Sequence, residues 1–362
     1  MTIKDLINTR LKNQLISDSK FNTAEQVVSH LGAVQAQDYY GSLWAIGLRL
    51  KNSSQESIEK EIATGKIVRT WPMRGTLHFV TAKDVRWMLK LLAPRIVAGS
   101  KRRHLQLELD EATFNRSREI FIRALQGGNK LTRDEMYSLL ESNNISAAGQ
   151  RGIHILGKLA MEGVICFGDR QGKQQTFVLL DEWITDFINL NREESLAEIT
   201  LRYFKSHGPA TLQDFTWWSG LTAADTRTGL ELVKSKLEHE QYNGRIFLFS
   251  SQKIVKSSSR ENSVLLSAFD EYLVGYKDRS DVLDIKHKKH ANAGGMLSPT
   301  IVVNGKVTGT WRRMIKNNKV LIEIFPFTSL NKKQHNKIII AAEQYGRFIN
   351  KTVCVNLKKW NL

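Results

Sequence analysis

Residues 130–145, KLTRDEMYSLLESNNI, together with the two segments that follow them, decide the fold of this chain. Thr132 is followed three residues later by Glu135, which is the pattern of a capping box at the start of a helix. Residues 151–164, RGIHILGKLAMEGV, carry apolar side chains at helical spacing. Residues 165–180, ICFGDRQGKQQTFVLL, alternate around a Gly-rich basic turn and predict a β-hairpin. Two helices followed by a basic hairpin predict a winged helix, a relative of the helix-turn-helix.

The same plan returns farther along the chain. Residues 194–222, ESLAEITLRYFKSHGPATLQDFTWWSGLT, predict a helix, a Gly-Pro turn and a second helix capped by Thr211. Residues 226–242 predict a third helix, and residues 244–250, GRIFLFS, predict a strand. The sequence therefore predicts an internal structural repeat.

The rest of the chain supplies further helices and hairpins. Residues 2–48 predict two helical runs with a break between them, and residues 69–80, RTWPMRGTLHFV, predict an extended segment. Asn304-Gly305 in residues 300–311 is a strong hairpin signal. The fold class that these elements predict is helix-rich α+β. We expect four regions, with boundaries at 1–109, 110–190, 191–262 and 263–362.

The charge of the chain indicates a polyanionic partner. Its 362 residues hold 53 Lys and Arg against 36 Asp and Glu, for a net charge of +17. Nucleic acid is the commonest partner for such an excess, and an anionic membrane surface or a merely basic protein are the alternatives. The fraction of hydrophobic residues, 41%, indicates a globular chain with room for two or three compact units.

Neither the cysteines nor the chain ends predict a secreted or membrane protein. The two cysteines, Cys166 and Cys354, offer no disulfide framework and no zinc spacing, and we expect both to be small buried hydrophobes in a reducing cytoplasm. No secretory signal and no apolar run of membrane-spanning length is visible. No metal, nucleotide or flavin motif is present, so the sequence predicts no cofactor.

Four blocks of the chain resemble the winged-helix DNA glycosylases typified by AlkZ and YcaQ. They are residues 34–38 (VQAQD), 69–80, 265–279 (LLSAFDEYLVGYKDR) and 297–313 (LSPTIVVNGKVTGTWRR), in family order. The first block matches the catalytic motif of the family, and its Gln35-Ala36-Gln37 resembles the AlkZ branch rather than the branch with aspartate in the third position.

The resemblance implies a fold and an activity. It implies three tandem winged-helix units that form a curved basic channel for duplex DNA. It also implies removal of alkylated purines, and the AlkZ type unhooks crosslinked purines as well. We expect a monomeric, cytoplasmic, nucleoid-associated enzyme that needs no cofactor.

Two glutamines suit a cationic leaving group. A purine alkylated at N3 or N7 departs as a neutral molecule, so the enzyme has only to hold a water and stabilise the positive sugar, which an amide carbonyl can do. In an extended segment Gln35 and Gln37 share a face, whereas in a helix they point about 200° apart, so the hypothesis requires a break in the helix. Asp38 competes for the role of base, and the alternative for both glutamines is a pair of solvated or capping amides at a turn.

Other residues are candidates for contacts with DNA. Tyr39 and Tyr40 could stack on an extruded base, and we expect Tyr40, which keeps register with Trp44, to pack in the core. The alternative for the remaining candidates is a solvated strand face or turn, and Asp270, Glu271 and Tyr272 of FDEY are interpreted as structural support. The candidate phosphate- or base-contacting residues are Arg69, Arg74, Thr76 and His78 in the second block, Lys286, His287, Lys288, Lys289 and His290 in a basic loop, and Trp311, Arg312 and Arg313 after the hairpin.

Two other classes of protein compete with a glycosylase. A winged-helix regulator or architectural protein would bind DNA without catalysis, but the chain has no dimerising heptad pattern or recognisable sensor domain. An RNA-binding protein would need an RRM or KH pattern, and none is visible.

Overall fold

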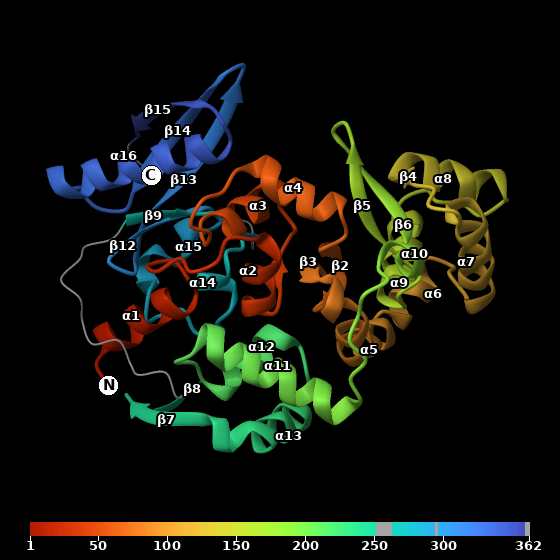
Figure 1. The fold of residues 1–362 in the computed structure, drawn as a ribbon, viewed down its shortest axis with the longest axis horizontal. Coiled ribbons are helices and arrows are strands. Elements are labelled where there is room, and N and C mark those ends of the chain that lie inside the picture. The colour runs from red at the N-terminus through yellow and green to blue at the C-terminus, as the bar shows by residue number, and fades with distance from the viewer. Residues whose placement is uncertain (251–262, 294–295, 359–362) are drawn as a thin grey trace. The chain divides into compact units, whose positions relative to one another are not determined.

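The chain divides into two compact units. A computed structural model describes residues 1–250, 263–293 and 296–358. The first unit joins Met1–Ile58 to Ala197–Leu362, and the second is the intervening Glu59–Leu196. Both contain helices and antiparallel strands, which confirms the helix-rich α+β fold class (Figure 1). The chain passes from the first unit to the second after Ile58 and returns to the first after Leu196. The four regions predicted from the sequence are instead consecutive segments of the chain.

The second unit is built around an antiparallel sheet with strand order β3-β2-β5-β6-β4. The β5–β6 hairpin follows helices α8 and α9, as the sequence predicts for a winged helix. The strands are β2 (Ile67–Met73), β3 (Thr76–Thr81), β4 (Leu131–Thr132), β5 (Ile165–Gln171) and β6 (Gln174–Leu179). The helices are α5 (Ala82–Gly99), α6 (Lys101–Gln106), α7 (Glu111–Leu125), α8 (Arg133–Ser142), α9 (Arg151–Met161) and α10 (Leu180–Trp183).

Local signals account for the start of α8 and for its packing. The hydroxyl of Thr132 accepts the N–H of Glu135, and the carboxylate of Glu135 accepts the N–H of Thr132 at 2.7 Å. This reciprocal pair is the predicted capping box. Buried apolar side chains from α7, α8, α9 and the hairpin, among them Phe121, Leu140 and Leu156, form one core beneath the sheet.

The segment 69–80 is a hairpin and not one extended run. Arg74 and Gly75 form its turn with φ angles of 55° and 69°, and Met73 pairs with Thr76 across it. The expectation of one extended segment over residues 69–80 was therefore wrong, because a left-handed backbone at Arg74 reverses the chain.

The first unit combines helices from both ends of the chain. The predicted second copy of the plan is present as three helices, over Arg192–His207, Leu212–Ser219 and Ala223–Val233. The helix predicted over residues 226–242 was wrong in its second half, because Leu237–Tyr242 form a strand that turns back at Asn243-Gly244 and pairs with Arg245–Ser250. The helices of the unit are α1 (Ile3–Asn13), α2 (Ala24–Leu31), α3 (Tyr39–Gly47), α12 (Leu212–Ser219), α13 (Ala223–Val233), α14 (Glu271–Val274), α15 (Lys288–Ala291) and α16 (Lys332–Phe348), with the 3₁₀ turns η1 (Lys234–Lys236) and η2 (Ile285–His287). Helices α4 (Gln55–Ala63) and α11 (Arg192–His207) cross the two unit boundaries.

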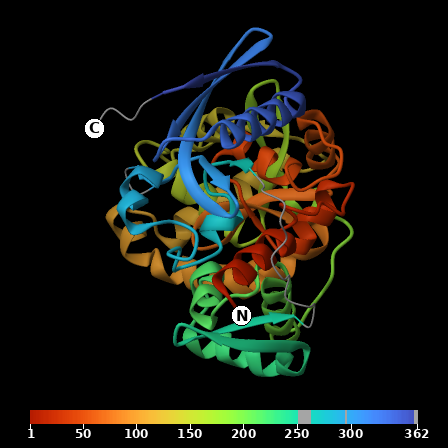
Figure 2. The same ribbon diagram turned by 90° about the vertical axis from the view of Figure 1, so that its left-hand side faces the viewer.

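A five-stranded sheet with the order β15-β14-β13-β12-β9 carries the C-terminal part of the first unit. Only β14 and β15 are parallel, and α16 packs against β9 and β15 (Figures 1 and 2). Asn304 and Gly305 form the predicted hairpin turn with φ angles of 50° and 75°. The strands of the unit are β1 (Val34–Gln35), β7 (Leu237–Tyr242), β8 (Arg245–Ser250), β9 (Ser263–Leu266), β10 (Asn292–Ala293), β11 (Met296–Leu297), β12 (Thr300–Val303), β13 (Lys306–Lys316), β14 (Lys319–Pro326) and β15 (Thr352–Leu357).

The two cysteines differ in burial. Cys166 is buried, but Cys354 is exposed, because it lies on β15 at the edge of the sheet; the expectation that both are buried was wrong. The predicted boundary at residue 262 falls outside the described residues. In the part of the chain that the structure describes, no helix has the length and apolar character to cross a membrane.

Candidate functional site

The Gln35-Ala36-Gln37 segment leaves the helix. Helix α2 ends before Gly32, whose φ of 85° reverses the chain, and the next helix begins only after Asp38. Gln35 lies on the short strand β1 with 7% of its surface exposed, whereas Gln37 is exposed. The two side chains are therefore not forced onto opposite faces of one helix, which removes the strongest structural objection to a shared role.

A buried carboxylate holds the backbone of Gln35. The N–H of Gln35 donates to Oε1 of Glu271 at 3.1 Å. The second oxygen of Glu271 accepts the indole N–H of Trp218 at 2.9 Å and lies 3.3 Å from Nε2 of His207. The side chains of Glu271 and His207 have no exposed surface. Because a buried carboxylate must be hydrogen-bonded, this network fixes the position at which the chain enters the motif.

The other residues of FDEY are also structural, as interpreted from the sequence. Asp270 binds Arg49 through two hydrogen bonds of 2.7 and 2.9 Å, and neither side chain is exposed. Burial alone would lower the pKa of the Arg49 guanidinium, but the charge of Asp270 raises it. The hydroxyl of Tyr272 donates to the carbonyl of Gly305 at 2.8 Å, which ties α14 to the β12–β13 turn.

Asp38 caps helix α3. Its Oδ1 accepts the N–H of Gly41 at 3.1 Å, and its Oδ2 lies 3.5 Å from a guanidinium nitrogen of Arg313. A Cβ at position 41 would lie 2.5 Å from Oδ2, so glycine permits this close approach. Arg313 also lies over the ring of Tyr345, 5.7 Å from its centroid, while burial raises the pKa of Tyr345. The structure thus brings two candidate residues together, Asp38 and Arg313.

The two tyrosines after Asp38 pack edge to face. Their ring centroids lie 5.4 Å apart, Tyr39 is half-buried and Tyr40 is 41% exposed. The expectation that Tyr40 packs in the core was wrong. The buried face of α3 begins one residue later, with Gly41, and continues through Leu43 and Trp44.

The β2–β3 hairpin of the second unit carries a small polar cluster. His78 is fully buried, its Nδ1 lies 2.9 Å from the carbonyl of Thr76, and its Nε2 lies 3.1 Å from a guanidinium nitrogen of Arg74. Because arginine can only donate, Nε2 accepts and the proton is on Nδ1. Arg69 is also buried, donates to the side chain of Gln175 at 3.1 Å and lies over the ring of Phe167.

The basic candidates of the first unit are mostly exposed. Lys286 is on η2 and pairs with Asp284 at 3.1 Å, while Lys288 and Lys289 begin α15. His287 stacks on Phe327 with ring centroids 4.5 Å apart, which anchors this basic segment. Arg312 is exposed on β13, and Trp311 is buried with its indole N–H donating to the carbonyl of Leu266.

Sequence reasoning missed the link between Glu271 and Gln35. The two residues lie 236 positions apart, and no local pattern connects them. Within residues 1–250, 263–293 and 296–358, His, Cys, Asp and Glu side chains form no group of three that could hold a metal ion.

Comparisons with known proteins give a consistent result. A family model described as DNA glycosylase AlkZ-like matches residues 28–348. An interstrand DNA cross-link repair glycosylase from Streptomyces sahachiroi is 25% identical over 336 residues, which cover 88% of this chain and 89% of that protein. The solved structure of the Streptomyces sahachiroi DNA glycosylase AlkZ has the same fold, with a TM-score of 0.77 at 23% identity, over 99% of this chain and 100% of that one.

Proposed function

Because this chain belongs to the AlkZ-like DNA glycosylases and is itself a DNA glycosylase, we propose that it removes purines alkylated at N3 or N7 from duplex DNA. The family model spans the Gln35-Ala36-Gln37 motif and both compact units. A glycosylase that acts inside a duplex extrudes its target nucleotide before the chemical step.

In the proposed mechanism the two glutamines position the attacking water. Cleavage of the N-glycosidic bond leaves positive charge on the sugar, and the departing alkylated purine takes the bonding electrons and becomes neutral. The water attacks C1′ and releases a proton to solvent, because an amide cannot hold it at neutral pH. The carbonyl dipoles of Gln35 and Gln37 orient the water and stabilise the sugar cation.

The observation that carries this proposal is the conformation of the motif. The chain is not helical from Gly32 to Asp38, and Glu271 holds the N–H of Gln35 from within the core. Gln37, two residues later, is exposed, as a residue that meets DNA has to be. An amide on a backbone fixed in this way needs little reorganisation when charge develops, and such preorganisation is a large source of catalysis.

Asp38 is proposed to position the motif rather than to act as a base. One of its oxygens caps α3 and the other faces Arg313, so both have structural partners. Its capping contact holds the start of α3 directly after Gln37.

We propose direct contacts with DNA only for candidate residues whose side chains are at least partly exposed. The buried Arg69 and His78 are proposed to support the hairpin that presents Arg74 and Thr76. Partly exposed Tyr39 is the candidate for stacking on an extruded or neighbouring base. The proposed phosphate contacts are Lys286, Lys288, Lys289, Arg312 and Arg313.

Interstrand cross-links are the second proposed substrate. The 25% identical relative from Streptomyces sahachiroi is a cross-link repair glycosylase by name. A purine joined to the opposite strand through N7 is cationic, so the same water-positioning chemistry applies to it. We further propose that the enzyme works as a cytoplasmic monomer on the nucleoid.

The test is base release. The protein is incubated with a duplex that contains a single N7-methylguanine, with the unmodified duplex as control, and with an N7-linked cross-linked duplex in a parallel arm. We expect free N7-methylguanine from the first and unhooked strands from the third. Salt-sensitive binding of all three duplexes without release of any base would instead support a DNA-binding protein without catalysis.

A further inference from the structure

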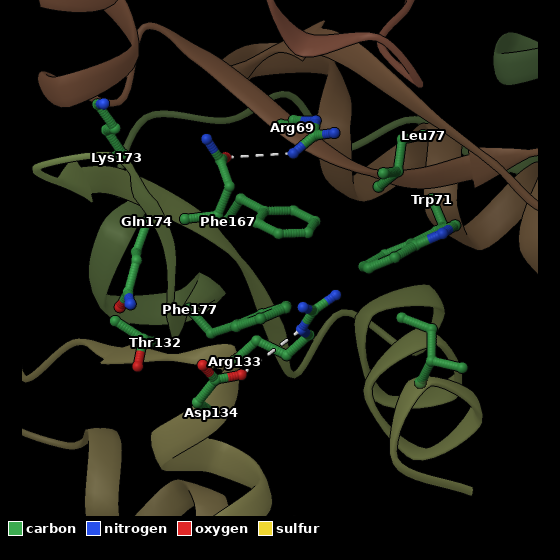
Figure 3. Close-up of a pocket in the computed structure, with 12 residues that line it drawn as sticks. Arg69, Trp71, Leu77, Thr132, Arg133, Asp134, Phe167, Lys173, Gln174 and Phe177 are labelled. Carbon is green, nitrogen blue, oxygen red and sulfur yellow. Dashed lines mark hydrogen bonds and ion pairs between the residues drawn. The ribbon is translucent and has the colours of Figure 1, made fainter. Parts of the chain in front are cut away.

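A cavity in the second unit has no part in the proposed chemistry. Its volume is about 510 Å³, within the usual range of ligand pockets. It is lined by the β2–β3 hairpin, the start of α8, one residue of α9 and the β5–β6 hairpin (Figure 3). It therefore lies at the wing of the second winged helix.

One wall of this cavity is apolar and aromatic. Trp71 and Phe167 pack with ring centroids 5.2 Å apart, and Phe167 packs on Phe177 at 4.5 Å. Leu77 and the 39% exposed Ile153 complete the apolar lining. Trp71 and Phe167 also belong to the buried core and are 9% and 7% exposed, so they offer a flat ring a small aromatic surface beside the more exposed Ile153.

Cationic side chains also line the cavity, beside the aromatic wall. Arg69 approaches Phe167 from one side, with its guanidinium carbon 4.7 Å from the ring centroid, and Arg133 lies on the other side in Figure 3. Lys173 lies at the turn of the hairpin. The single carboxylate of the lining, Asp134, lies 3.9 Å from Arg133, and the three cations Arg69, Arg133 and Lys173 outnumber it, so the lining carries a net positive charge.

We propose that this cavity binds one unpaired nucleotide of the bound DNA. The base contacts the wall formed by Trp71, Phe167 and Ile153, and its phosphate is held by Arg133 and Lys173. A paired base cannot enter, because its faces are covered by its neighbours in the stack. The inference rests on DNA binding by the family and not on the chemistry of the two glutamines.

The test compares two duplexes of equal length, one fully paired and one with a single bulged adenosine. Fluorescence anisotropy gives the Kd of each. We expect the wild-type protein to bind the bulged duplex about tenfold more tightly, as one stacked base provides. Arg133→Gln/Lys173→Gln and, separately, Ile153→Trp, which fills the cavity without a change of charge, should each reduce this preference to less than about twofold.

Matched variants separate the cavity from charge and from catalysis. Arg102→Gln/Arg123→Gln removes two exposed charges of the same unit outside the cavity and should weaken binding of both duplexes equally. Gln35→Ala/Gln37→Ala should keep the preference for the bulge even if it abolishes base release. The proposal is overturned by equal affinity of the wild type for both duplexes, by an unchanged preference in Ile153→Trp, or by an equal loss of preference in the Arg102/Arg123 variant.

Discussion

Replacement of Glu271 by Gln tests whether the buried carboxylate that holds the backbone of Gln35 supports catalysis. The carboxylate accepts the N–H of Gln35 and the indole N–H of Trp218, and it lies within hydrogen-bond distance of His207. A hydrogen bond to a charged group contributes about 1.5–3 kcal/mol, against about 0.5–1.5 kcal/mol for a neutral pair. Neutralising a group with three partners therefore predicts a loss of about 3 kcal/mol in the free energy of unfolding.

The effect on the rate should exceed what lost stability explains. Without its charged acceptor, the backbone of Gln35 relaxes, and a displacement of about 1 Å in a catalytic group costs roughly 100-fold in rate. We expect Glu271→Gln to lower the single-turnover rate of N7-methylguanine release by about 10- to 100-fold at saturating enzyme, at a temperature where the variant is folded. The Kd for the duplex should stay within about threefold of the wild-type value, since Glu271 is buried.

Trp218→Phe is the matched control. It removes one donor to the same carboxylate and some core volume, so we expect a comparable loss of stability, about 2–3 kcal/mol. It leaves the contact between Glu271 and the N–H of Gln35 in place, and its rate should remain within about threefold of wild type. Equal rates for the two variants, or a wild-type rate for Glu271→Gln, would refute the reasoning.

Three further predictions concern Asp38, the basic segment and pH. Asp38→Asn keeps a capping oxygen for α3 and should lower the rate of base release by less than about tenfold, whereas a general base at this position would cost far more. Lys288→Gln/Lys289→Gln removes two proposed phosphate contacts and should make the plot of log K against log salt shallower by about 1.8, as equilibrium binding between low and moderate salt would measure; an unchanged slope would contradict the contacts. Burial lowers the pKa of His30 from 6.5 to about 4. As the pH falls, the imidazole of His30 therefore takes up a proton in the unfolded chain before it does so in the folded chain. The free energy of unfolding is highest above pH 6.5 and decreases as the pH falls towards 4. The decrease is about 3 kcal/mol at most, because the ring is partly exposed. Denaturant unfolding at several pH values should show that His30→Gln flattens this dependence, and an equal slope in the variant would contradict it.

The parts of the fold that depend on neighbouring residues could be predicted from the sequence. The capping box of Thr132 and Glu135 and the Asn304-Gly305 turn each involve residues only a few positions apart, so a short stretch of sequence contains all the groups that interact. The break of helix at Gln35 was predictable for the same reason, because Gly32 and the capping Asp38 flank it.

The rest of the site depends on residues that only the folded chain brings together. Glu271 reaches Gln35 over 236 positions, and Asp270 reaches Arg49 over 221 positions. The sequence showed these acidic residues but could not show their partners. Burial was also mispredicted where tertiary position overrides residue type, as at Cys354 on an edge strand and at Tyr40 in the first turn of α3.

The most direct test of the account is base release by the Gln35→Ala/Gln37→Ala variant. Duplex DNA with a single N7-methylguanine is mixed with excess enzyme, and free base is measured over time beside the Kd for the same duplex. We expect a rate at least about 100-fold below wild type with a Kd within about threefold, because loss of electrostatic stabilisation and of water positioning affects the transition state and not binding. A variant that binds the duplex normally and still releases N7-methylguanine at the wild-type rate would contradict the central claim.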